Sequence, residues 1–178
     1  RTVKMMQFYN ENSSEINEKA VDLEREVASS LLQIGVPAHI KGYQYLSTAI
    51  LLTVKDRDII DSATKRLYPS VARKYVTTTS RVEGAIRKAI DIAWDRGNVD
   101  ILNSYFGYTI ANNRGRPTPT EFIAMIADDL TVKESDDPMV TKVTKILHQC
   151  GVPADIKGYN YLRTAILLTV KDSDIINS

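Results

Sequence analysis

The sequence is poor in the residues from which disulfides, metal sites and catalytic sites are built. Cys150 is the single cysteine among 178 residues, so the chain has no internal disulfide and no cysteine pair at metal-ligand spacing. His39 and His148 are far apart, and neither has a cysteine or carboxylate partner at ligand spacing. We therefore expect no metal and no cofactor, and we expect Cys150 to be a small core residue near a helix end.

Segments typical of a membrane protein or of common enzyme classes are missing as well. No run approaches about 18 apolar residues, and the first residues, RTVKMMQFYNENSS, turn polar too early for a signal peptide. No glycine-rich phosphate loop and no nucleophile elbow occurs. The sequence therefore predicts a cytoplasmic protein with no membrane partner, no catalytic residue and no enzymatic activity. Because residue 1 is arginine, we also expect this N-terminus to be internal to a longer protein.

The composition is that of a folded chain with nearly balanced charge. Hydrophobic residues make up 43% of the chain, charged residues make up 25%, and the net charge is +1. These values exclude global disorder, and the length suits one domain and part of another. A basic binding surface must therefore be local.

One stretch of the sequence occurs twice. Residues 35–61 and 151–177 align without a gap at an offset of 116, and 22 of the 27 positions are identical. The exchanges are His39/Asp155, Gln44/Asn160, Ser47/Arg163, Arg57/Ser173 and Asp61/Asn177. This spacing is too long for a solenoid or propeller unit of about 20–50 residues, but it suits a whole small domain. We therefore expect one domain followed by a partial second copy of its first helices.

The apolar periodicity is helical throughout, and no segment alternates with a period of two. We expect a helix from a Ser13 or Ser14 cap to Gly35, and others at about 43–55, 58–68, 69–76, 80–95, 98–107 and 118–130. The helix at 80–95 begins with Ser80 and Glu83 in a capping-box pattern. Its apolar face is expected to comprise Val82, Ala85, Ile86, Ala89, Ile90, Ala93 and Trp94. The sequence predicts an all-α protein.

Two of these helices, at 69–76 and 80–95, are joined by a short turn in the outline of a helix-turn-helix. Between Lys65 and Arg96, eight Lys and Arg stand against three Asp and Glu. The positive charge that the chain lacks as a whole is therefore concentrated here, as phosphate binding requires. Cations on an exposed helical face can also serve solvation alone, and the pattern by itself leaves both interpretations open.

In a helix-turn-helix the first turns of the second helix enter the major groove. There Arg81 and Arg87 can bind guanine, and Glu83 can accept a hydrogen bond from cytosine. The free amides at the start of this helix are suited to phosphate. We therefore expect phosphate contacts from the remaining candidates, Lys74, Thr78, Thr79 and Ser80.

Five motifs between Val27 and Leu130 also carry a family resemblance. In order they are GVPAHIKGYQYL, LYPSVARKY, TTTSRVEGAIRKAIDIAWDRGN, FGYT and PTPTEFIAMIADDL. Together they resemble the C-terminal effector domains of the stage 0 sporulation protein A family, the response regulators of the sporulation phosphorelay. The resemblance implies a six-helix domain with an internal helix-turn-helix. It further implies a homodimer on double-stranded DNA that reads tandem promoter boxes and contacts the housekeeping sigma factor of RNA polymerase.

The resemblance and the repeat divide the chain into four expected parts. Residues 1–22 are a linker or a remnant of an upstream domain, and 23–131 are the helix-turn-helix effector domain. Residues 132–138 are an acidic linker, and 139–178 are the partial repeat of the N-terminal helices. No segment resembles the phosphorylatable receiver domain that normally precedes this effector domain.

Carried over position by position, the resemblance places base readers on Arg81, Glu83 and Arg87, with Lys88 beside them where the family usually has histidine. Gly84 stands where the family has a base-reading arginine. Glycine inside a helix costs about 0.5–1 kcal/mol relative to alanine. A lost bidentate base contact removes about 1–3 kcal/mol of discrimination. We therefore expect weaker or altered sequence preference, with phosphate affinity retained.

The sequence thus predicts a DNA-binding transcription regulator of sporulation. The alternative is a protein-interaction or regulatory paralogue that dimerises with, or titrates, a full regulator, and Gly84 and the incomplete repeat favour it. One hypothesis for the repeat is domain swapping, in which residues 139–178 replace residues 27–61 of another chain.

Overall fold

The computed structural model describes residues 2–111 and 115–176, and of residues 108–111 and 174–176 it describes the backbone alone. Every regular element in this part of the chain is a helix, which confirms the all-α prediction. In chain order they are α1 (Thr2–Ile34), α2 (Lys41–Lys55), the 3₁₀-helix η1 (Arg57–Ser62), the π-helix η2 (Ala63–Leu67), α3 (Tyr68–Lys74), α4 (Thr79–Arg96), α5 (Val99–Ala111), α6 (Pro119–Glu134), α7 (Pro138–Cys150) and α8 (Lys157–Ile176).

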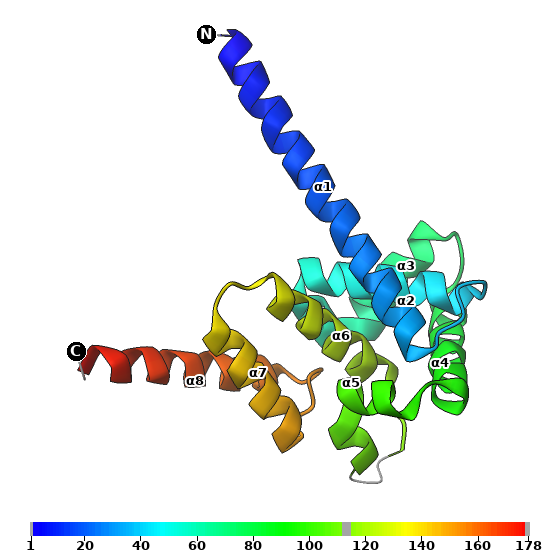
Figure 1. Cartoon of the computed structure of the whole chain (residues 1–178). Coiled ribbons are helices and arrows are strands. Elements are labelled where there is room, and N and C mark those ends of the chain that lie inside the picture. Colours follow the sequence, from blue (N-terminus) through cyan, green and yellow to red (C-terminus); the bar gives the residue numbers. More distant parts are fainter. Residues whose placement is uncertain (1, 112–114, 177–178) are drawn as a thin grey trace.

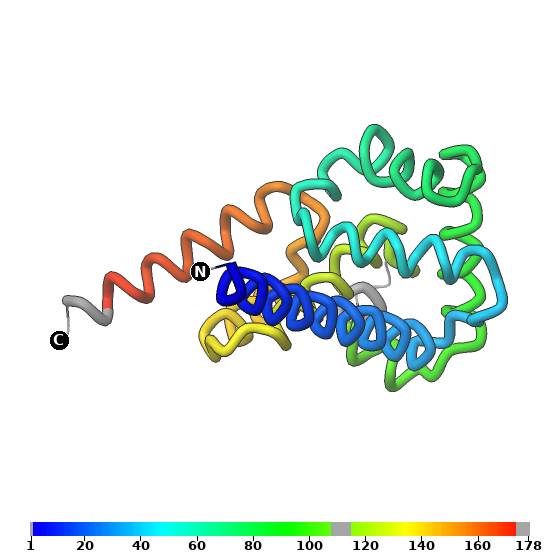
Figure 2. The backbone as a smooth tube through the Cα atoms, turned by 90° about the horizontal axis from the view of Figure 1, so that it is seen from above, coloured from blue at the N-terminus to red at the C-terminus, as the bar shows by residue number. Residues whose placement is uncertain are grey.

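Residues 23–134 form one helical body, from which the N-terminal part of α1 and the C-terminal part of α8 extend (Figures 1 and 2). Helix α2 lies at its centre and packs against α1, α4 and α6. Residues from most of its circumference are therefore buried, namely Gly42, Tyr45, Leu46, Thr48, Ala49, Ile50 and Thr53. Tyr45 is buried, whereas Tyr43, two residues earlier in the helix, is half-buried.

Two glycine contacts set the distances between α1, α2 and α4. A Cβ atom at Gly42 would lie 2.3 Å from the carbonyl oxygen of Ala85 in α4. At the other end of α4, a Cβ atom at Gly97 would lie 2.6 Å from the carbonyl oxygen of Ile34, and one at Gly35 would lie 3.1 Å from the Cα of Gly97. Because only glycine allows backbones to approach this closely, α2 crosses α4 near its middle and the C-terminal ends of α1 and α4 meet.

Helix α1 begins at Thr2, so the predicted start at Ser13 or Ser14 is wrong. The Ser13 hydroxyl donates to the carbonyl of Tyr9 at 2.7 Å, and the Ser14 hydroxyl donates to that of Glu11 at 2.8 Å. Both side chains therefore bond back within a continuous helix instead of capping a new one. Burial begins at Leu23, and the preceding residues of α1 are exposed.

Three further helix boundaries differ from the predictions. The segment expected to hold a helix at 58–68 is a 3₁₀-helix followed by a π-helix. Helix α5 continues past Gly107 to Ala111 through a kink at Phe106 (φ −128°, ψ 20°), so Gly107 does not end it. Helix α6 extends to Glu134, which leaves residues 135–137 as the connection to α7.

The second copy packs on the helical body through α7, which contacts α5 and α6, and α8 packs on α7. Tyr159 of α8 is fully buried, and Ala154 before it is 2% exposed. Their counterparts Tyr43 and Ala38 are half-buried and exposed, respectively. The second copy therefore docks with residues that are less buried in the first copy. Cys150, at the end of α7, is exposed, so its prediction as a core residue is wrong.

An ion-pair cluster around Asp128 holds this docked segment. The Asp128 side chain in α6 is 1% exposed, and its Oδ1 atom lies 3.0 Å from Arg57 Nε and 3.6 Å from Arg163 Nη1. The Nε2 atom of His148 lies 3.8 Å from Asp128 Oδ2 and 2.9 Å from the Tyr159 hydroxyl. A buried carboxylate is tolerated only when it is paired, so the cluster depends on both copies.

Acid is expected to loosen this contact. Burial acts to raise the pKa of the Asp128 carboxyl, but the facing His148 and the positive charges of Arg57 and Arg163 lower that pKa below its ordinary value. Because the folded-state pKa is depressed, the stability contribution is full above the unfolded-state value of about 3.9 and is lost as pH falls through the folded-state pKa. Asp128→Asn should be less stable by about 1–3 kcal/mol at neutral pH.

Urea unfolding of both proteins from pH 7 to pH 3 measures this effect. The gap in free energy of unfolding between wild type and Asp128→Asn should close in the acid range. A gap that stays constant would show that the Asp128 charge contributes nothing to the docking.

The close approach of α2 to α4 predicts a large effect of one methyl group. Gly42→Ala should lower the free energy of unfolding by about 1–3 kcal/mol, because the new Cβ overlaps the Ala85 carbonyl. Gly158 is the counterpart of Gly42 in α8, and a Cβ atom there meets nothing within 4 Å. Gly158→Ala is therefore the matched control, and it should be neutral or stabilising by up to about 1 kcal/mol. Equal effects in urea unfolding would contradict this account.

Candidate DNA interface

Helices α3 and α4 form a helix-turn-helix whose turn is fixed by local hydrogen bonds. The amide of Thr77 donates to the carbonyl of Ala72 at 2.9 Å, and the Thr78 hydroxyl accepts from the amide of Arg81 at 3.3 Å. Thr78 is therefore the N-cap of α4, and the predicted cap at Ser80 is wrong because Ser80 is already helical. Between the helices, Val76 has a left-handed conformation (φ 51°) and is 93% exposed.

Helix α4 separates a buried face from an exposed one, as its periodicity predicts. The buried residues are Val82, Ile86, Ala89, Ile90 and Ala93. Ala85 and Trp94, which were expected beside them, are half-buried, and Trp94 packs on Phe106 at a ring-centroid distance of 5.2 Å. This packing fixes the rotation of α4 and directs its polar residues outward.

The exposed residues of the first turns form a stripe along α4. Ser80, Arg81, Gly84, Arg87 and Lys88 are all exposed and recur at helical spacing. A Cβ atom at Gly84 would meet nothing within 4 Å, so the middle of the stripe is an open gap. Figures 1 and 2 both place α4 on the side of the molecule away from α8, so α8 does not cover the stripe.

Two of the predicted base readers are paired with each other. Arg87 Nη2 lies 3.0 Å from Glu83 Oε1, one turn earlier in α4, and both side chains are at least partly exposed. An exposed pair of this spacing contributes about 0.3–0.5 kcal/mol. Separating it to let each side chain reach a base therefore costs little.

The predicted phosphate contacts gather at the N-terminal end of α4. Thr78 and Ser80 are exposed and Thr79 is half-buried, so the free amides of this helix end are accessible. Lys74, at the end of α3, donates to the Thr48 hydroxyl at 3.3 Å and lies over the Tyr75 ring at 5.5 Å. Helix α2 thus positions this lysine beside the turn.

A family comparison fits this geometry. The family model for the C-terminal domain of the sporulation initiation factor Spo0A matches residues 27–130 and 143–178. The chain belongs to this family. The match confirms the resemblance, and it covers the helix-turn-helix and most of the second copy. Domains of the Spo0A C-terminal family are DNA-binding effector domains of sporulation.

Arg116 contacts α4 of this Spo0A-type domain, and the sequence did not predict that contact. Arg116, from the loop before α6, binds two carboxylates of α4, with Nη1 2.6 Å from Asp91 and Nη2 2.5 Å from Asp95. It neutralises the acidic half of α4 and leaves the basic N-terminal half dominant. The basic loop ANNRGRP was a signal for such a residue, but its target 21 to 25 residues earlier in the chain depends on the tertiary fold.

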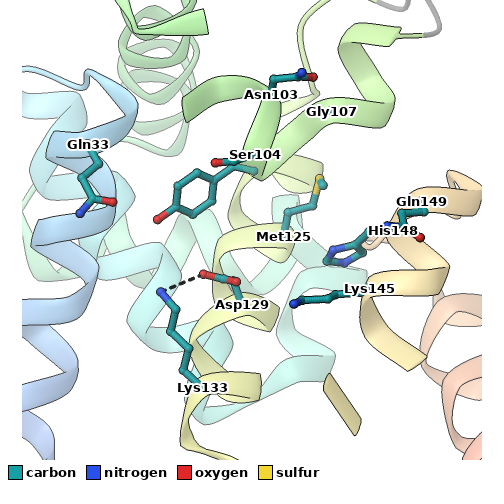
Figure 3. A pocket seen from close by; sticks show the side chains of 11 residues that line it. Gln33, Asn103, Ser104, Gly107, Met125, Asp129, Lys133, Lys145, His148 and Gln149 are labelled. Carbon is teal, nitrogen blue, oxygen red and sulfur yellow. Dashed lines mark ion pairs between the residues drawn. The ribbon is translucent and has the colours of Figure 1, made fainter. Parts of the chain in front are cut away.

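A cavity of about 630 Å³ lies elsewhere on this Spo0A-type fold, between α1, α5, α6 and α7 (Figure 3). Its polar lining includes Lys145, His148 and the ion pair of Lys133 with Asp129 at 3.2 Å. No three His, Cys, Asp or Glu side chains of the described residues gather as metal ligands. None of the helices in the described ranges is long and apolar enough to cross a bilayer. The stripe on α4 remains the candidate site.

Proposed function

We propose that this chain is a transcription regulator of the sporulation response-regulator type that binds promoter DNA through α3 and α4. The observation that carries the proposal is the exposed basic stripe of α4, which is presented by a helix-turn-helix and remains uncovered by α8. Its family membership supports the same function. The protein acts in the cytoplasm, within a phosphorelay, as a homodimer on tandem promoter boxes and in contact with the housekeeping sigma factor.

In this proposal Arg81 and Arg87 bind guanine in the major groove, and Glu83 accepts from cytosine. Lys88 lies on the same stripe as a further base contact. The phosphates are held by the amides and hydroxyls at the start of α4 and by a lysine of α3, the set Lys74, Thr78, Thr79 and Ser80. Phosphate contacts set affinity and register, while the base contacts set sequence preference.

A regulatory role through protein contacts is the second candidate. The gap at Gly84 removes a base-reading side chain from the middle of the stripe, and α8 carries apolar residues that the helical body does not cover. Such a chain dimerises with, or titrates, a full regulator, and it binds DNA only weakly and without sequence preference.

DNA binding is tested by titrating a promoter-box duplex and a scrambled duplex at several salt concentrations. Affinity should fall steeply with salt, and Lys74→Ala should reduce the salt slope by about one. Arg81→Ala should cost about 1–3 kcal/mol on the promoter box and much less on scrambled DNA. Lys171→Ala, on the distant helix α8, is the control. Weak binding that is equal on both duplexes would favour the second candidate.

Filling the gap at Gly84 should sharpen sequence preference. Gly84→Arg restores a side chain at an open position of the helix, where it creates no clash. The ratio of promoter to scrambled affinity should rise by about tenfold, while affinity for scrambled DNA changes little. Gly84→Ala is the control for helix propensity and should leave the ratio unchanged. An unchanged ratio for the arginine variant would refute a reading role at this position.

A further inference from the structure

Two carboxylates continue the stripe on α4 toward the C-terminal end of the helix. Asp91 and Asp95 follow Gly84 and Lys88 at spacings of three and four residues, so all four lie on one face of α4. The Asp91 side chain is 46% exposed, and that of Asp95 is 63% exposed. The face of α4 that is proposed to bind DNA is therefore basic in its first half and acidic in its second half.

Uncovered carboxylates on this face would oppose DNA binding in two ways. B-DNA carries one negative charge about every 1.7 Å along its axis, so a carboxylate that faces it is repelled by the phosphates. Asp91 also lies four residues after Arg87 and three after Lys88, and at these spacings oppositely charged side chains of one helix attract each other. Arg87 is paired with Glu83 instead, and Lys88 makes no ion pair with any residue that the structure describes. A free carboxylate at position 91 would therefore compete with DNA for two of the proposed base contacts.

Arg116 occupies both carboxylates at once. Its Nη1 atom lies 2.6 Å from Asp91 Oδ1, and its Nη2 atom lies 2.5 Å from Asp95 Oδ1. The two acids are one helical turn apart, and each terminal nitrogen of the planar guanidinium takes one of them. Within the described part of the chain, no other cation pairs with either acid. The acidic half of the face is therefore neutralised by this one side chain.

The position of Arg116 is set by α6 and not by the helix that it contacts. The next residue, Pro117, is buried, and Thr118 caps α6 by accepting from the amide of Glu121 at 3.2 Å. Helix α6 in turn packs against α2 and α4. The guanidinium is therefore held beside α4 in the absence of DNA, so the two carboxylates are already covered when DNA binds.

We infer that Arg116 is a positioning residue for DNA binding, and that it acts through Asp91 and Asp95. By holding both carboxylates it removes their charge from the face of α4 that meets DNA, and it leaves Arg87 and Lys88 free to contact bases. The inference rests on the proposed function, because it concerns the same face of α4. It adds that recognition by α4 requires the loop before α6 to be in place.

The test titrates a promoter-box duplex and a scrambled duplex with the full chain and its variants, at about 50 mM and about 200 mM salt. Arg116→Ala should weaken binding to both duplexes by about three- to tenfold at the lower salt concentration. The loss should be smaller at the higher concentration, because salt screens the repulsion between carboxylates and phosphates. Arg25→Ala removes another exposed arginine that is paired with an aspartate, Asp22 of α1. It is the matched control and should bind normally.

Neutralising the two acids separates this role from a purely structural one. In a chain that carries Asp91→Asn and Asp95→Asn, Arg116→Ala should no longer reduce affinity, because no carboxylate is left to cover. If Arg116 only ties the loop to α4, the triple variant should bind as weakly as Arg116→Ala. That result, or an unchanged affinity of Arg116→Ala, overturns the inference. Should the alanine variant fail to fold, Arg116→Gln keeps a hydrogen-bond donor without the charge, and it should show the same loss and the same rescue.

The same titrations distinguish failure of this inference from failure of the proposed function. Equal binding of the wild-type protein to both duplexes would overturn promoter recognition, while a loss of affinity in Arg116→Ala would still support the positioning role. Preference for the promoter box with no effect of Arg116→Ala would overturn the inference alone. Absence of binding by the wild-type protein to either duplex would overturn both.

Discussion

The crossing of α2 over α4 is the contact on which the rest of the structure depends. A side chain at Gly42 would meet the backbone of Ala85, so the helices are held at a distance that only glycine permits. This crossing fixes the rotation of α4, which turns its apolar face inward and its basic stripe outward. The outward orientation of Arg81 and Arg87 is therefore decided in the core, far from either guanidinium.

Ion pairs hold the second copy in place, whereas apolar packing holds the helical body together. The carboxylate of Asp128 is buried under groups from both copies, and its pairing requires Arg57 from one and Arg163 from the other. A buried ion pair adds little net stability compared with apolar packing, but it penalises any arrangement that leaves one partner alone. The cluster thus selects one docked geometry for the second copy.

Features of the fold that depend on neighbouring residues in the chain could be predicted from the sequence. The periodicity of α2, α4 and α6 follows from neighbouring residues, and the bounds of these helices were predicted to within a few positions. The kink at Phe106 and the exposure of Cys150 depend on what packs nearby, which periodicity does not report. The start of α1 was missed because Ser13 and Ser14 bond back within a continuous helix instead of capping a new one. For the site, the outward face of α4 was predictable, whereas Arg116 was not, because its partners lie across a tertiary contact.

The meeting of Gly35 and Gly97 has a mechanical consequence. Helix α1 comprises 33 residues, which corresponds to a rod of about 50 Å. Its exposed N-terminal part extends away from the helical body, while Gly35, just after its other end, meets Gly97, the first residue after α4. Because a side chain at either glycine would meet the backbone of the other element, the two backbones are in direct contact, so a sideways force on the far end of α1 is transmitted to the C-terminal end of α4. Helix α4 also carries the exposed basic stripe.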